Sequence, residues 1–168
     1  MQTKRIIRCA LFACIALIIF VLEAQIPPPV AIPGVKLGLA NMVTLASLYI
    51  LGARDTFFIL IVRIFLGNLF TGQAISLLYS LFGGVLCFVV SVGLKRFFSG
   101  NTIWALGVIG ALFHNIGQIV CAVIMFKTSS LVYYGLVLCL MSLATGSFTG
   151  LCAQFTVKLF NKLNPFIT

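Results

Sequence analysis

The chain has 168 residues, of which 62% are hydrophobic and only 8% are charged. This composition excludes an ordinary soluble domain, and at roughly 20 apolar residues per crossing the length allows about six membrane helices and no soluble domain besides. The net charge of +9 does not indicate nucleic-acid binding, because no basic run is longer than Lys4-Arg5. We therefore expect an all-α protein that forms a single integral membrane domain over residues 1–168.

The first apolar run covers residues 6–26, with Lys4 and Arg5 before it and Arg8 near its start, as in the basic and apolar parts of a signal peptide. The run is long, however, and the residues before any cleavage near Ala24 fit a signal peptidase site poorly. We expect an uncleaved first helix, which ends where four of the chain's five prolines follow within residues 27–33.

The stretch from residue 23 to residue 41, EAQIPPPVAIPGVKLGLAN, is the polar and proline-broken passage between two apolar runs. It begins with Glu23, one of only two acidic residues, and contains Lys36 and Asn41. A charge beside the hydrocarbon phase needs a partner or a wet cavity. The stretch is therefore either a lid that faces a ligand or a solvated connector with an interfacial lysine.

The remaining apolar runs predict five further helices. Asp55 precedes the third of the six, and Asn101 precedes the fifth, so each is expected to be a helix N-cap. The predicted boundaries are 37–51, 56–70, 73–94, 102–126 and 131–160.

The distribution of lysine and arginine predicts the orientation. A cytoplasmic N-terminus places eight basic residues on the cytoplasmic side and leaves only Lys36 and Lys127 outside, in agreement with the positive-inside rule. We therefore expect both termini in the cytoplasm and a multi-pass location in a bacterial cytoplasmic membrane.

Small residues recur at helical spacing on two of the predicted helices. Ser142, Gly146 and Gly150 lie on one face of the last helix, where close packing inside the bundle is expected. The first helix carries a similar strip, which is suited either to internal packing or to another subunit. The residues of this strip are Cys9, Ala10, Ala13 and Cys14.

The polar residues of the predicted helices converge in the outer half of the membrane when depth is taken as 1.5 Å per residue. Arg63 is the strongest signal, because an arginine at mid-depth is costly and must face the protein interior. It either binds a ligand or forms a buried pair with Glu23 that holds helices together. The candidate ligand-binding residues are Glu23, Lys36, Asn41, Arg63, Asn68, His114, Asn115 and Gln118.

The chemistry that is missing argues against an enzyme. Phosphoryl or prenyl transfer needs several carboxylates to hold Mg²⁺, and this chain has two acidic residues in total. It has no GxxxxGK[ST] phosphate loop, and its six cysteines lack metal-binding spacing. We expect no catalytic residues, no metal and no cofactor in this chain.

Several motifs together carry a family resemblance: Glu23 with IPP at 26–28, PGVKLGLAN at 33–41, Arg63, LYSLFGG at 78–84 and HNIGQ at 114–118. From about residue 23 to residue 150 the chain resembles the Gx transporter family, often labelled heptaprenyl diphosphate synthase component I. That family is similar to the substrate-binding S components of energy-coupling factor (ECF) vitamin importers.

The resemblance implies a six-helix bundle that binds a small molecule from outside. It also implies a transmembrane coupling subunit and two ATPases as partners, so that ATP is used by the partners and not by this chain. In S components a small-residue face on the first helix docks on the coupling subunit, which gives a role to Cys9, Ala10, Ala13 and Cys14.

Two other functions remain open. The first alternative to the importer is a non-catalytic accessory subunit of isoprenoid or quinone synthesis. The second is a small secondary transporter that uses Glu23 as its proton site. Gene neighbours that encode ATPases would favour the importer, and a neighbouring prenyl synthase would favour the accessory subunit.

Overall fold

The computed structural model describes residues 2–26, 36–72, 74–127 and 131–163. These residues form six α-helices and one short 3-10 helix, and the described residues include no β-strand. The helices are α1 (Gln2–Glu23), α2 (Asn41–Ile50), α3 (Ala53–Thr71), α4 (Ala74–Leu94), η1 (Lys95–Phe97), α5 (Ile103–Phe126) and α6 (Leu131–Leu163). The predicted all-α fold is confirmed for this part of the chain.

Among the described residues, four segments are long and apolar enough to cross a membrane: Thr3–Glu23, Ala74–Phe97, Ile103–Phe126 and Gly135–Leu163. The helix α2 has only 10 residues, about 15 Å, which is half the thickness of the hydrocarbon core. The helix α3 has 19 residues but carries Arg54, Asp55 and Arg63. The described chain therefore has the helices of a membrane protein, and six full crossings stay a prediction.

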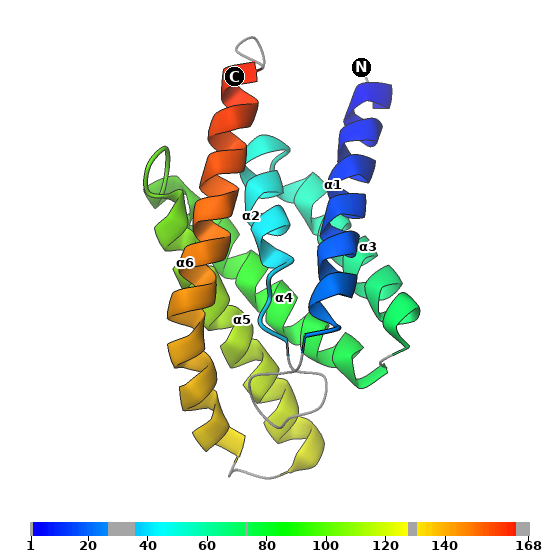
Figure 1. Cartoon of the computed structure of the whole chain (residues 1–168), viewed down its shortest axis with the longest axis vertical. Coiled ribbons are helices and arrows are strands. Elements are labelled where there is room, and N and C mark those ends of the chain that lie inside the picture. Colours follow the sequence, from blue (N-terminus) through cyan, green and yellow to red (C-terminus); the bar gives the residue numbers. More distant parts are fainter. Residues whose placement is uncertain (1, 27–35, 73, 128–130, 164–168) are drawn as a thin grey trace.

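The short helix α2 lies at the centre of the bundle (Figure 1) and contacts each of the other five α-helices. Seven of its ten residues are buried. The long helices α5 and α6 run side by side, α4 packs on α5, and α1 packs mainly on α3. The start of α1 and the end of α6 lie at the same end of the molecule (Figure 1).

The helices α5 and α6 approach closely because glycines face each other where they cross. A Cβ atom at Gly150 would lie 2.4 Å from the backbone oxygen of Trp104, and one at Gly107 would lie 2.4 Å from the Cα atom of Gly150. A Cβ atom at Gly146 would lie 2.7 Å from the Cα atom of Val108. The internal packing expected for this face of the last helix is confirmed.

Three predicted helix starts are wrong, and for two of them a contact elsewhere in the chain gives the reason. The second helix begins at residue 41 and not at residue 37, since the preceding residues bind the end of α1. Asp55 does not cap α3: Gly52 is the N-cap residue, and Asp55 lies in the first turn of the helix. Thr102 takes the N-cap position of α5 in place of Asn101.

Asp55 instead forms an ion pair that joins α3 to the N-terminal part of α1. Its two oxygens accept hydrogen bonds from Arg5, at 2.6 Å from Nε and 2.5 Å from the terminal nitrogen. Arg5 is 58% exposed and Asp55 is 10% exposed at the side chain. This bidentate pair fixes the lateral position of α1, and it removes one of the two acidic residues from any role inside the bundle.

Candidate functional site

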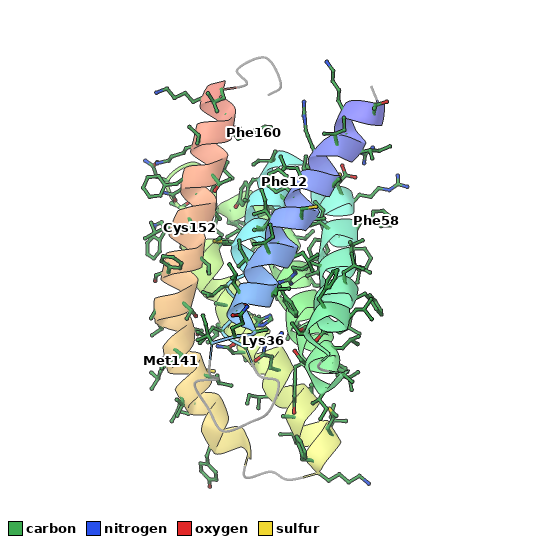
Figure 2. All side chains as sticks on the ribbon, turned by 45° about the vertical axis from the view of Figure 1, so that its right-hand side comes forward. Phe12, Lys36, Phe58, Met141, Cys152 and Phe160 are labelled. Carbon is green, nitrogen blue, oxygen red and sulfur yellow. The ribbon has the colours of Figure 1, made fainter. Side chains whose placement is uncertain are left out.

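All eight predicted site residues are buried in the structure, each less than a tenth exposed. They come from the end of α1, the segment 36–40 that leads into α2, the start of α2, and the middle parts of α3 and α5. Figure 2 shows Lys36 in the interior, whereas Phe58 and Met141 lie on the outer surface. The fold brings six of the eight into one cluster, described below, and sets Asn68 and Asn115 at its edge.

Glu23 holds the segment 36–40 against the end of α1. One carboxylate oxygen accepts a hydrogen bond from the backbone nitrogen of Gly38 at 2.5 Å, and the other accepts one from that of Ala40 at 3.4 Å. Glu23 forms no ion pair with Lys36 or Arg63 among the described residues. Of the two alternatives for Arg63, a buried ion pair with Glu23 is not formed, because the carboxylate binds the backbone nitrogens of Gly38 and Ala40.

Lys36 and Arg63 share one aromatic ring. The Lys36 ammonium lies 3.6 Å from the centre of the Phe20 ring, and the Arg63 guanidinium carbon lies 5.7 Å from it. Arg63 also donates one hydrogen bond to Asn41 Oδ1, at 3.3 Å. Burial lowers the pKa of Lys36, which lies between α1 and α2, to about 8, and the Glu23 carboxylate opposes this shift. The two basic side chains thus both lie against the ring of Phe20.

His114 and Gln118 form the opposite side of the cluster on α5. Gln118 Nε2 donates to the backbone oxygen of Lys36 at 3.2 Å and lies 2.8 Å from His114 Nε2. Because an amide nitrogen cannot accept, His114 Nε2 is the acceptor and its proton resides on Nδ1. Gly38, at φ 81°, packs so closely that a Cβ atom there would lie 2.8 Å from Asn41 Nδ2 and 3.0 Å from the His114 ring.

Asn68 and Asn115 use their amide nitrogens on helix backbone. Asn68 Nδ2 donates to Ile64 in its own helix at 2.7 Å, and Asn115 Nδ2 donates to Leu138 of α6, also at 2.7 Å. No hydrogen bond joins either side chain to the rest of the site within the described residues. The side-chain carbonyl oxygens of Asn68 and Asn115 remain able to accept a hydrogen bond.

Seven of the eight predicted residues contain a buried polar atom that has no hydrogen-bond partner in the described part of the chain. Buried polar groups are almost always hydrogen-bonded in folded proteins. These atoms are therefore free to form hydrogen bonds with a further molecule. The atoms are Lys36 Nζ, Asn41 Nδ2, Arg63 Nε, Asn68 Oδ1, His114 Nδ1, Asn115 Oδ1 and Gln118 Oε1.

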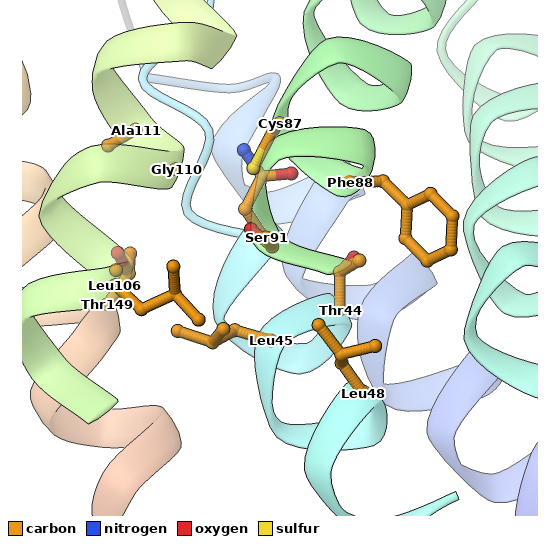
Figure 3. Close-up of a pocket in the computed structure, with 12 residues that line it drawn as sticks. Thr44, Leu45, Leu48, Cys87, Phe88, Ser91, Leu106, Gly110, Ala111 and Thr149 are labelled. Carbon is orange, nitrogen blue, oxygen red and sulfur yellow. The ribbon is translucent and has the colours of Figure 1, made fainter. Parts of the chain in front are cut away.

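A small enclosed cavity adjoins the cluster at Asn41 (Figure 3) and extends along α2 between α4, α5 and α6. Its polar lining includes Thr44, Ser91 and Thr149, and the hydroxyl of Thr44 has no partner among the described residues. The cavity measures about 20 Å³, which is room for one water molecule. It extends the polar interior but is too small to hold a vitamin-sized ligand.

The candidate ligand-binding residues do not include Phe20, nor Ser76 and Tyr79, which are fully buried on α4 and whose hydroxyls have no partner among the described residues. Phe20 stands three residues before Glu23 and therefore lies on the same helix face. Ser76 and Tyr79 precede the buried pair Gly83-Gly84 at helical spacing. The sequence signal for Ser76 and Tyr79 is this row of small and polar residues along one face of an otherwise apolar helix.

The remaining expectations concern α1 and metals. Of the predicted partner strip, Ala10 and Cys14 are exposed on α1, and Cys9 and Ala13 are partly buried. No group of three or more metal-ligating side chains occurs among the described residues. The partner role of the strip stays a prediction.

Comparison with known proteins gives one match. A family model described as heptaprenyl diphosphate synthase component I matches residues 12–156. The match covers most of the chain and includes all the residues of the cluster. No curated protein and no solved structure matches the chain.

Proposed function

Since this chain belongs to the heptaprenyl diphosphate synthase component I family, we propose that it is a membrane subunit that captures a small molecule from the outer side. The proposal rests on one observation, the seven unpartnered polar atoms of Lys36, Asn41, Arg63, Asn68, His114, Asn115 and Gln118. A site of this kind offers cationic and neutral donors together with amide oxygens, which suits a ligand with an anionic or carbonyl group.

The segment 36–40 would act as the cover of this site. It lies over His114 and Gln118, and the Glu23 carboxylate holds it at the end of α1. Release of its two hydrogen bonds to Glu23 and of the one from Gln118 would free the segment without unfolding a helix. Because Glu23 has this structural task, a proton-carrying role for it in secondary transport is the less favoured function.

The partners that we propose are a transmembrane coupling subunit and two ATPases, as in an ECF-type importer. The sequence contains no GxxxxGK[ST] phosphate loop, so uptake against a gradient would draw its energy from these partners. An exposed small-residue position on α1, at Ala10, would let a partner helix approach closely.

A substitution on α1 tests the partner proposal. Ala10→Leu is expected to abolish complex formation with the ATPases and ATP-dependent uptake, because added bulk keeps the partner helix away. Binding of the small molecule to the isolated protein should stay unchanged, because Ala10 faces away from the bundle. Leu11→Ala, a change at a neighbouring exposed position, serves as the control. Uptake that persists without the ATPases would contradict the proposal and favour a secondary transporter.

The family name favours a second candidate, a non-catalytic accessory subunit of heptaprenyl diphosphate synthase. The two acidic residues are both engaged, Glu23 with backbone and Asp55 with Arg5, so neither is available to hold Mg²⁺ for prenyl transfer. Affinity purification distinguishes the two candidates. Co-elution with a prenyl synthase supports the accessory role, and co-elution with ATPases supports the importer.

The orientation carries its own prediction. On a cysteine-free background, Lys127→Cys should be labelled by an impermeant thiol reagent from outside intact cells, and Arg96→Cys should be labelled only after lysis. Both positions are exposed. Lys127 directly follows the last residue of α5, whereas Arg96 lies in η1, which precedes the first residue of α5, so the two positions flank the two ends of this helix. The reverse labelling pattern would place the cluster on the cytoplasmic side and exclude capture from outside.

A further inference from the structure

The buried charges of the cluster do not balance. Four charged residues are less than a tenth exposed among the described residues: Glu23, Lys36, Asp55 and Arg63. Asp55 is paired with Arg5 outside the cluster. The cluster therefore contains two basic side chains and one acidic one.

The anion does not satisfy the two cations directly. Glu23 attracts both Lys36 and Arg63 electrostatically, but its oxygens bind the backbone nitrogens of Gly38 and Ala40. Lys36 Nζ and Arg63 Nε are left without hydrogen-bond partners in the described chain. An uncompensated positive charge and two unused charged donors in a buried site are unfavourable unless an anion is bound.

We infer that the ligand carries a single negative charge, in the form of one carboxylate group placed between Lys36 and Arg63. This inference rests on the proposed function. The two oxygens of a carboxylate can accept hydrogen bonds from both charged donors, Lys36 Nζ and Arg63 Nε, and its single charge cancels the excess. A diphosphate, with two or more negative charges at neutral pH, would reverse the imbalance.

The opposite side of the cluster suits the rest of such a ligand. On this side, Gln118 Oε1 is an unpartnered acceptor and His114 Nδ1 is an unpartnered donor. The amide oxygen would accept an N–H or O–H group of the ligand and would repel a second carboxylate. The ligand class is thus a small monocarboxylate with hydrogen-bond donors, and not a prenyl diphosphate.

Three probes that differ in charge test the inference. The thermal unfolding midpoint of the purified protein is measured with acetate, with its neutral analogue acetamide and with inorganic diphosphate, at equal ionic strength. Acetate should raise the midpoint by a few degrees, and the other two should not. The increase should disappear in Lys36→Met and in Arg63→Gln, and it should persist in Arg96→Gln, which removes an exposed cation far from the cluster.

Each outcome decides a different point. If diphosphate or acetamide stabilises the wild-type protein as much as acetate does, the single-carboxylate inference is overturned, and the binding site stands. If no probe shifts the midpoint, the cluster is not a ligand site, and the proposed function falls with it. An acetate effect that is equal in wild type and Lys36→Met would reflect a general salt effect and would also overturn the inference.

Discussion

Replacement of Arg63 by glutamine should abolish binding of the captured molecule, with a loss of affinity of about 100-fold or more. A hydrogen bond to a charged group contributes roughly 1.5 to 3 kcal/mol, and loss of the guanidinium also removes the charge. Arg63→Lys should recover part of the attraction but not the planar donor geometry. Binding to the purified variants is the measurement, and Arg96→Gln is the control for loss of an exposed cation.

Arg63→Gln should not lower the free energy of unfolding as much as the loss of one partner of a buried ion pair would. Removal of one partner of a buried salt bridge costs about 3 to 5 kcal/mol, but Glu23 binds backbone nitrogens and forms no ion pair with Arg63. A double-mutant cycle of Glu23→Gln and Arg63→Gln on unfolding free energy should therefore give a coupling below about 1 kcal/mol. Strong coupling with unchanged ligand affinity would mean that Arg63 has only a structural role.

The second large effect is expected at the crossing of α5 and α6. Gly150→Ala should destabilise the protein by about 3 kcal/mol or more, because the added Cβ atom would lie 2.4 Å from a backbone oxygen and the helices would have to separate. Gly93→Ala is the matched control, since a Cβ atom at Gly93 meets nothing within 4 Å. There the helix propensity of alanine should leave stability unchanged or slightly higher.

Thermal unfolding of the two glycine variants beside the wild type provides the comparison. A Gly150→Ala protein as stable as Gly93→Ala would show that α5 and α6 are not in close contact. Since α5 carries His114 and Gln118 and α6 accepts a hydrogen bond from Asn115, such a result would also change the proposed site.

The helices and the buried site residues could be predicted from the sequence because hydrophobic runs and polar interruptions determine them locally. Arg63 and the HNIGQ motif stand out in apolar helices, where a polar side chain must face the interior. The glycines of the last helix were informative for a different reason: their spacing places them on one face, where small residues allow close helix packing.

The errors arose where tertiary contacts decide the structure. The N-terminal residues of the predicted second helix are not helical, because Glu23 binds the backbone nitrogens of Gly38 and Ala40 and Gly38 has a positive φ angle. Asp55 has the residue type of an N-cap, but Arg5, fifty residues away, is its partner. No local pattern reveals that a carboxylate will prefer backbone donors to a nearby cation.

The central claim is that the buried cluster binds a small molecule. The most direct test is to incubate the immobilised wild-type protein and its Arg63→Gln and Arg96→Gln variants with a small-molecule extract of cells, and to identify the retained compounds by mass spectrometry. We predict that wild type and Arg96→Gln retain a compound that Arg63→Gln does not. Retention of the same compounds by all three proteins, or of none by any of them, would contradict the claim.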